Sequence, residues 1–266
     1  MTTHEPIPVT ERELAAMTRD LEELHHETMP AVYASVAEWV EQTEPERVGR
    51  SGATRRAFLI GSAATLGAAV LAACGSSSSK VSPSSSVPAG ATPSTSANAS
   101  VDLKVAALAT SLENLAVATY QSGIDAATAG KLGTVPPAVV TFAKTAQAQH
   151  KDHAAAWNAI LTAAGKPAVS GVDMTVKTGV VDPAFANVKD VTGLAKLALQ
   201  LEEVAAATYL SGIGVLKSAG GVKTSASIQP VEMQHAAILH FVLGEYPVPD
   251  SFAQTTGART LTDTIG

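Results

Sequence analysis

The chain has 266 residues, a formal net charge of -6 and a hydrophobic content of 46%. Its one cysteine, Cys74, excludes a disulfide framework, a thiolate metal site and a cysteine nucleophile within the folded domain. No basic patch, Gly-rich phosphate loop or Gly-x-Ser-x-Gly motif occurs, which argues against nucleic-acid partners and against phosphate-loop or serine-hydrolase chemistry.

Residues 1–50 are interpreted as an acidic amphipathic leader. Apolar residues recur there at helical spacing: Leu14, Met17, Leu21 and Leu24. This spacing predicts a cytoplasmic helix over residues 11–42, interrupted near Pro30. Three further side chains are expected to be surface or packing residues rather than ligands: His25, His26 and Trp39. Cleavage of a following export signal would remove the whole segment, and a later start at Met17 or Met29 is an alternative.

Residues 51–74 carry the pattern of an export address. Arg55 and Arg56 precede an uncharged apolar run over residues 57–73, which ends in small residues before Cys74. The run resembles a twin-arginine export signal joined to a lipoprotein cleavage box. The resemblance implies passage through the twin-arginine export machinery, followed by lipidation of Cys74 and anchoring on the outer face of the cell membrane. A short buried helix or an uncleaved signal anchor is the alternative.

Residues 75–100 consist almost wholly of small and polar residues with Pro, and they contain no aromatic residue. Such a segment cannot bury enough apolar surface to offset its chain entropy. It is predicted to be a disordered tether.

Four helices are predicted within residues 101–252. Their expected bounds are 101–129, 136–165, 188–219 and 224–243. Short breaks marked by Gly and Pro separate the first two and the last two, so each pair should form an antiparallel hairpin: Gly130, Gly133, Pro136 and Pro137, then Gly220 and Gly221. Residues 165–187 lack a helical period and are long enough to cross the bundle. The fold class is therefore all-α, a four-helix bundle of two hairpins joined by one long crossover, with residues 253–266 as a tail. Two independent hairpins are the alternative.

A thirteen-residue phrase occurs twice in this segment. Residues 112–124 return as residues 201–213, with nine of the thirteen positions identical. The retained residues include an acid and a tyrosine two helical turns apart, hence on one helix face. These pairs are Glu113 with Tyr120, and Glu202 with Tyr209. Because each copy is followed by a helix carrying a histidine before two alanines, the repeated unit is a helix pair.

Carboxylate and imidazole side chains come from all four predicted helices. They are Glu113, His150, His153, Glu202, Glu232 and His235. Buried charges need partners, so these side chains are expected to meet one another or a metal ion. Glu203 points about 100° away from Glu202 around the helix and is expected in solvent. The remaining polar or aromatic candidates are expected to support the site or the packing: Tyr120, Tyr209, Gln149, Trp157 and His240.

The set resembles the di-metal carboxylate site of the ferritin-like superfamily, which takes one Glu from each of two helices and a Glu-x-x-His from each of the other two. Over residues 101–252 the chain is similar to exported ferritin-like domains related to desiccation-associated plant proteins. The resemblance implies that Glu113 and Glu202 are the lone carboxylates. It also makes Glu232 and His235 one complete Glu-x-x-His.

The second Glu-x-x-His pair departs from this pattern, because His150 stands where a Glu is expected, before His153. The site therefore has one negative charge fewer, and an imidazole bridges two metals less readily than a carboxylate does. The mixed oxygen and nitrogen donors suit iron, manganese or zinc, with one ion, two ions or none as open alternatives.

Two functional hypotheses follow. The first is an oxidase-type metalloprotein of the cell envelope that oxidises iron or removes peroxide. The second is a lipid-anchored, metal-free structural or binding module that kept the bundle and lost the chemistry. Whether the protein is an enzyme is thus left open. A homo-oligomer is compatible with the resemblance, since ferritin-like bundles range from monomers to large shells.

Overall fold

The computed structural model describes residues 10–43 and 94–260. Five long helices dominate these residues: α1 (Glu11–Thr43), α3 (Ser94–Thr128), α4 (Pro137–Ala163), α7 (Val191–Ile213) and α8 (Ala219–Val242). The described residues contain no strand. None of their helices is both long and apolar enough to cross a membrane. Arg55, Arg56 and Cys74 lie outside the described residues, as does most of the predicted tether.

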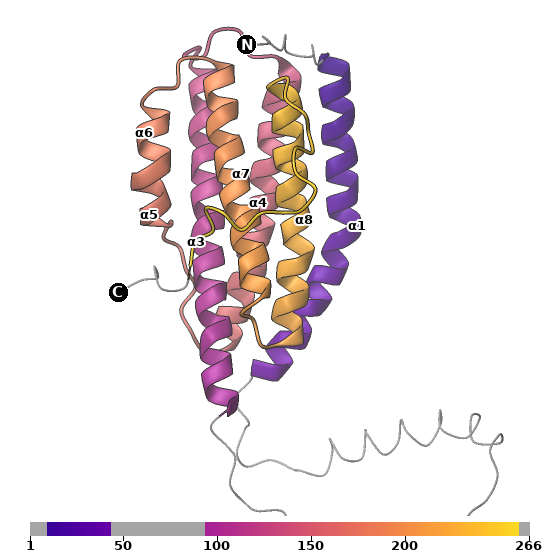
Figure 1. Ribbon diagram of the computed structural model, residues 1–266, viewed down its shortest axis with the longest axis vertical. Coiled ribbons are helices and arrows are strands. Elements are labelled where there is room, and N and C mark those ends of the chain that lie inside the picture. Colours follow the sequence, from indigo (N-terminus) through magenta and orange to yellow (C-terminus); the bar gives the residue numbers. More distant parts are fainter. Residues whose placement is uncertain (1–9, 44–93, 261–266) are drawn as a thin grey trace, which may run out of the picture. The chain divides into compact units, whose positions relative to one another are not determined.

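The predicted bundle of two hairpins is confirmed in its helical class and arrangement. α3 packs against α4, and α7 packs against α8 (Figure 1). In the first connection Gly130 and Gly133 have φ of 70° and 72°, a region that favours glycine. α3 begins at Ser94, inside the segment predicted as tether, so the first helix is longer than the sequence indicated.

The crossover differs from the expectation of a stretch without helices. It contains α5 (Met174–Val176), a π-helical turn (Lys177–Val181) and α6 (Asp182–Phe185). Asp173 starts them, since its side chain accepts a hydrogen bond from the Val176 backbone N–H at 2.8 Å. Buried valines at 176 and 181 then pack with leucines of α3 and α7. Each piece is too short to produce a helical period in the sequence.

The connection between α7 and α8 lies before the two glycines that were predicted to form it. Gly220 and Gly221 belong to the first turn of α8, and the chain turns over residues 214–218 instead. The Ser218 hydroxyl caps α8 by accepting from the Gly221 N–H at 3.0 Å. Gly220 is needed for packing, because a Cβ at that position would lie 2.7 Å from Cβ of Trp39 on α1.

Helix α1 is a fifth helix that packs on α4 and α8 (Figure 1). A capping box opens it: the Thr10 N–H donates to Glu13 Oε2 at 3.0 Å, and the Glu13 N–H donates to Thr10 Oγ1 at 3.2 Å. The predicted interruption at Pro30 is wrong, since α1 continues through it. Packing of both halves on the bundle offsets the one backbone hydrogen bond that proline removes.

The buried face of α1 is rotated from the one the apolar residues suggested. Its buried apolar side chains are Leu14, Leu21, Met29, Val32, Val36 and Trp39. Leu24 is 40% exposed, whereas His25 is only 4% exposed. α1 therefore turns a histidine toward the bundle.

Besides the cluster beneath the crossover, two apolar clusters occupy the bundle, one around Trp157 and Ile160 and the other around Phe142 and Leu239. α1, α3, α4, α7 and α8 each contribute to both clusters. Along α3, α4, α7 and α8, the carboxylates and imidazoles fall between the residues of one cluster and those of the other. The fold thus surrounds a polar layer with apolar packing.

Candidate metal centre

Two glutamates of the repeated phrase lie on either side of His150. Glu113 on α3 is 2% exposed and Glu202 on α7 is 1% exposed. The Tyr120 hydroxyl donates to Glu202 Oε1 at 2.5 Å, and the Tyr209 hydroxyl donates to Glu113 Oε1. Each tyrosine therefore binds the carboxylate of the other copy. Both tyrosines, which were expected to support the site or the packing, thus contact a lone carboxylate.

His150 on α4 contacts both lone carboxylates. Its Nδ1 lies 2.7 Å from Glu113 Oε2, and its Nε2 lies 3.2 Å from Glu202 Oε1. The ring is completely buried and lies 5.6 Å, centre to centre, from the ring of Tyr120. The imidazole that replaces the expected glutamate thus spans the two carboxylates.

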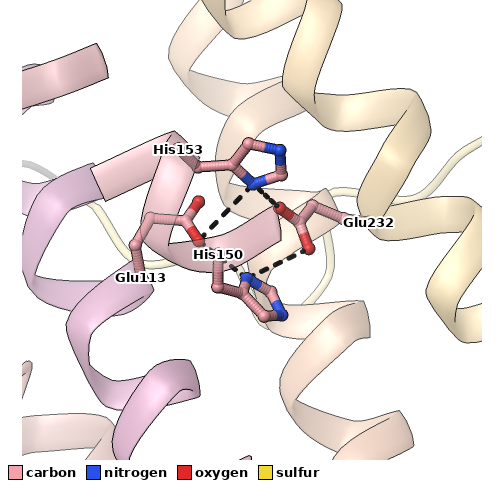
Figure 2. Close-up of side chains that lie close together, drawn as sticks. All are labelled: Glu113, His150, His153 and Glu232. Atoms are coloured by element: carbon pink, nitrogen blue, oxygen red, sulfur yellow. Dashed lines mark hydrogen bonds and ion pairs between the residues drawn. The ribbon is translucent and has the colours of Figure 1, made fainter. Parts of the chain in front are cut away.

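Glu232 on α8 lies among three imidazoles, of which Figure 2 shows those of His150 and His153. Its Oε1 is 3.0 Å from His153 Nδ1, while its Oε2 is 3.4 Å from His235 Nδ1 and 3.8 Å from His150 Nδ1. All six side chains singled out in the sequence are therefore brought together from four helices, and each is at most 2% exposed.

The donor atoms of these side chains form two overlapping groups that could each hold a metal ion. The first group is Glu113, His150, His153 and Glu232, and the second is His150, Glu202, Glu232 and His235. The ligand atoms of each group lie within 4.8 Å of one another. His150 and Glu232 belong to both groups, but only the Glu232 carboxylate could serve two ions at once, because a neutral imidazole binds one.

Three donor atoms of the cluster are buried and make no well-aligned hydrogen bond within the described residues, although they lie within ion-pair distance of their neighbours. They are both carboxylate oxygens of Glu232 and Nδ1 of His153. Buried polar atoms are satisfied in most proteins, and these three lie close together. A divalent cation would accept lone pairs from all three. With a mixed carboxylate and imidazole donor set, the residues present fit iron, manganese or zinc.

Without metal, the glutamates and histidines stabilise one another's charges. Burial alone would raise the pKa of Glu202, but the imidazoles of His150 and His235 outweigh burial and hold that pKa well below its usual value. Burial alone would lower the pKa of His150, but Glu202 and Glu232 outweigh it and raise that pKa well above its usual value. A metal ion must displace the protons that these imidazoles carry. The affinity of the cluster for metal should therefore rise with pH.

The metal-free protein is expected to be most stable at mildly acidic pH. Burial opposes both ion pairs, yet His153 and His150 lower the pKa of Glu113 to about 2, and Glu113 and Glu232 raise the pKa of His153 to about 9. The contribution of Glu113 is complete above its ordinary pKa of 4.5 and lost as the pH falls toward 2. That of His153 is complete below its ordinary pKa of 6.5 and lost as the pH rises through 9.

Urea unfolding of the metal-free protein across this range measures the effect. The free energy of unfolding should be highest between the two ordinary pKa values, 4.5 and 6.5. A free energy that keeps increasing from pH 6.5 to pH 9 would show that His153 is not held as an imidazolium.

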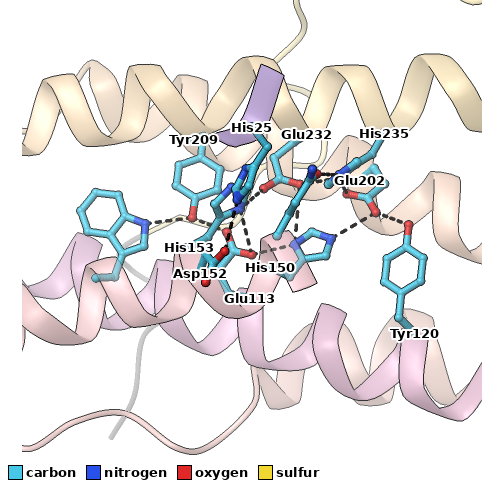
Figure 3. Close-up of polar contacts among 12 residues, drawn as sticks. His25, Glu113, Tyr120, His150, Asp152, His153, Glu202, Tyr209, Glu232 and His235 are labelled. Atoms are coloured by element: carbon cyan, nitrogen blue, oxygen red, sulfur yellow. Dashed lines mark hydrogen bonds and ion pairs between the residues drawn. The ribbon is translucent and has the colours of Figure 1, made fainter. Parts of the chain in front are cut away.

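Further polar residues orient the cluster from outside (Figure 3). The Trp157 indole N–H donates to the Tyr209 hydroxyl at 2.9 Å, which continues the chain that ends at Glu113. Gln149 Oε1 lies 2.7 Å from His235 Nε2. Both residues therefore take the supporting positions that were expected of them.

Glu203 and His240 lie away from the cluster. The Glu203 side chain is 56% exposed and lies 3.5 Å from His240 Nε2. His240 Nδ1 is 2.7 Å from Glu245 Oε2 at the end of α8. The expectation that Glu203 would be in solvent is met, and His240 belongs to a surface ion-pair group.

His25 reaches the edge of the cluster from α1, although it was expected to be a surface or packing residue. Its Nε2 lies 3.2 Å from Asp152 Oδ2, and its ring centre is 5.8 Å from that of His153. Burial lowers its pKa more strongly than Asp152 raises it. The signal was present in the sequence, because His25 is four residues from both Leu21 and Met29 and thus on their helix face.

Comparison with known proteins gives one result. A family model described as "Ferritin-like domain" matches residues 101–245, which cover α3 to α8. No curated protein and no solved structure matches the chain.

Proposed function

Since the chain belongs to the ferritin-like domain family, we propose that it is an exported, lipid-anchored protein that binds one or two iron or manganese ions in its buried cluster. The ions would serve iron oxidation or peroxide removal at the cell envelope. The observation that carries this proposal is the position of Glu232, whose two buried oxygens accept no well-aligned hydrogen bond from the described residues although imidazole nitrogens of three histidines lie 3.0, 3.4 and 3.8 Å away.

Each residue of the cluster has a distinct part in this proposal. Glu113 and His153 would hold one ion, and Glu202 and His235 the other, with Glu232 shared and His150 available to either ion. The chemistry that bound iron would supply is electron transfer, in which two ferrous ions and two protons reduce one hydrogen peroxide to two waters. The apolar clusters on both sides keep bulk water away from the donors.

The two tyrosines would keep the lone carboxylates in place. Burial, with the carboxylate each one contacts, raises the pKa of Tyr120 and of Tyr209 well above the ordinary value. Both hydroxyls therefore stay protonated at neutral pH and donate to Glu202 and Glu113. Such donors fix the orientation of the ligand oxygens, which leaves the second oxygen of each carboxylate for the ion.

A metal-free module is the second candidate, and the position of His150 favours it. Its two nitrogens lie at hydrogen-bonding distance from Glu113 and Glu202, so an imidazolium there joins both carboxylates without any ion. Three protonated histidines and three glutamates would also give the buried cluster no net charge. Protons on the histidines would then balance the charge of the glutamates, as metal ions would in the first proposal.

Oxidation kinetics test the first proposal. The full-length chain is freed of metal, loaded with ferrous iron in the absence of oxygen, and mixed with dioxygen or hydrogen peroxide. Formation of ferric iron, followed by stopped-flow absorbance, should be faster than for the same iron in buffer. Equal rates with and without the protein would leave the metal-free module as the better explanation.

The proposed export concerns Arg55, Arg56 and Cys74. Cleavage ahead of Cys74 would separate α1 from the rest of the bundle. Under this proposal α1 packs on the bundle only in the uncleaved precursor. Lipidation of Cys74 would provide two acyl chains, which suffice for stable anchoring without a spanning helix.

The substitution Cys74→Ser is expected to release the protein from membranes. Cell fractionation followed by immunoblotting measures the distribution, and the mass of the membrane-bound protein identifies its first residue. The wild-type protein should begin at Cys74 and resist salt extraction. Tight membrane association of the variant, or a membrane-bound form that still contains residues 11–43, would contradict the lipoprotein assignment.

A further inference from the structure

Two cavities flank the buried cluster, and the repeated phrase relates them. The first borders Thr119, Tyr120 and Gly123 of the first copy, and the second borders Thr208, Tyr209 and Gly212 at the equivalent positions of the second copy. The facing helix also repeats, because Ala198 and Leu201 line the first cavity where Ala109 and Leu112 line the second. Each cavity therefore ends beside the tyrosine that binds a lone carboxylate.

The first cavity is small and almost wholly apolar. Its volume is about 50 Å³, and its walls are aliphatic and aromatic side chains apart from the hydroxyls of Thr119 and Tyr120. The Thr119 hydroxyl donates to the Leu115 carbonyl at 2.8 Å, and the Tyr120 hydroxyl donates to Glu202. Both donors are engaged, so the cavity offers no hydrogen-bond donor to water or to hydrogen peroxide. Apolar walls without free donors hold water poorly and favour apolar guests.

The second cavity differs in size and chemistry. Its volume is about 230 Å³, and its lining includes Ser211, Ser225 and Arg259. It can therefore accommodate water with hydrogen-bonding partners. The duplication thus places an almost wholly apolar cavity beside Tyr120 and one with several polar groups in its wall beside Tyr209.

We propose that the cavity beside Tyr120 is, in the full-length chain, a binding site for a small apolar molecule, which during iron oxidation is dioxygen. Leu14 of α1 forms part of its wall, so removal of α1 would open the cavity on that side. A diatomic molecule fits the volume, and Tyr120, whose hydroxyl donates to Glu202, forms part of the wall. The absence of free donors selects dioxygen over peroxide as the guest. The choice of dioxygen rests on the proposed function, whereas the binding of an apolar guest does not.

Gly123 helps to shape the cavity. A Cβ at that position would lie 2.9 Å from Cδ2 of Leu194, another wall residue, so a larger side chain would push Leu194 into the space. At the equivalent position of the second copy, a Cβ on Gly212 would meet nothing closer than 3.6 Å. The tighter packing around Gly123 agrees with the smaller volume of the first cavity.

Xenon binding to the metal-free, full-length protein tests the site directly. Crystals pressurised with xenon should show one atom bounded by Gly123, Leu194 and Ala198. Ala198→Leu should fill the cavity and abolish that peak, and the smaller change Ala198→Val serves if the leucine variant does not fold. Ala109→Leu, at the equivalent position in the second cavity, is the matched control and should keep the xenon.

The outcomes separate the two proposals. Absence of xenon from the wild type, its persistence in Ala198→Leu, or its loss in Ala109→Leu would each overturn the binding site. Xenon bound as expected in a protein that takes up no iron would support the site and reject the proposed function. In the iron-loaded protein, Ala198→Leu should slow oxidation by dioxygen and leave oxidation by hydrogen peroxide unchanged. Equal slowing with both oxidants would overturn the assignment to dioxygen.

Discussion

Glu232→Ala is expected to abolish metal binding while the protein stays folded. Glu232 is the one carboxylate that both donor groups share, and it lies among His150, His153 and His235. Loss of a residue that merely supports a ligand typically costs 10 to 100-fold in metal affinity, so loss of a shared ligand should cost more than about 100-fold. Elemental analysis of the purified variant after anaerobic incubation with ferrous iron measures the result.

Two variants separate loss of the ligand from loss of the fold. Glu232→Gln keeps the shape of the side chain and removes its charge, so it should also lose metal. Glu203→Ala removes an exposed carboxylate next to Glu202 and should keep the wild-type metal content. Circular dichroism should show the same helix content in all three. Full metal content in Glu232→Ala would show that Glu232 is not the central ligand of the site.

Trp39→Ala is expected to give the largest loss of stability of any substitution in α1. Trp39 is 1% exposed and meets Trp157 edge to face at 5.9 Å between ring centres. Truncation of a buried Trp or Phe to Ala costs roughly 3 to 5 kcal/mol, because it loses apolar burial and leaves a cavity. Urea unfolding of the full-length chain measures the change.

Tyr33→Ala is the matched control, since Tyr33 lies on the same helix and is 52% exposed. It should change the free energy of unfolding by no more than about 0.5 kcal/mol. Gly220→Val tests the packing of α1 from the side of α8. A Cβ at position 220 would lie 2.8 Å from the Ser35 carbonyl oxygen, so this variant should also destabilise the protein. If Trp39→Ala and Tyr33→Ala behave alike, α1 does not pack on the bundle in solution.

The bundle and its cluster were predictable because the duplication carries both. The repeated phrase sets Glu113 and Glu202 as equivalent positions, and glycine and proline separate the first two helices. The central position of Glu232 and the crossed tyrosine contacts were not predictable. Both depend on how the helices are rotated and shifted against one another. The spacing of residues along a single helix does not specify this arrangement.

The packing of α1 was missed for a physical reason. Its buried face includes polar residues, Thr18 and His25, while Leu24 points into solvent, so apolar spacing alone gave the wrong rotation. Pro30 and the export signal predicted after it also favoured a separate, interrupted leader. Burial of Trp39 against α8 depends on Gly220, more than 180 residues away in the chain, and no local pattern reveals such a contact.

Metal content of the full-length chain is the most direct test of a ferritin-like metal protein. The protein is purified, and iron, manganese and zinc are measured by elemental analysis before and after anaerobic addition of ferrous iron. The proposal predicts about one or two ions per chain, bound more tightly as the pH rises. A well-folded protein with no metal above background in either condition would contradict the proposal. The glutamates and histidines would then form a metal-free core in which protonated histidines balance the charge of the glutamates.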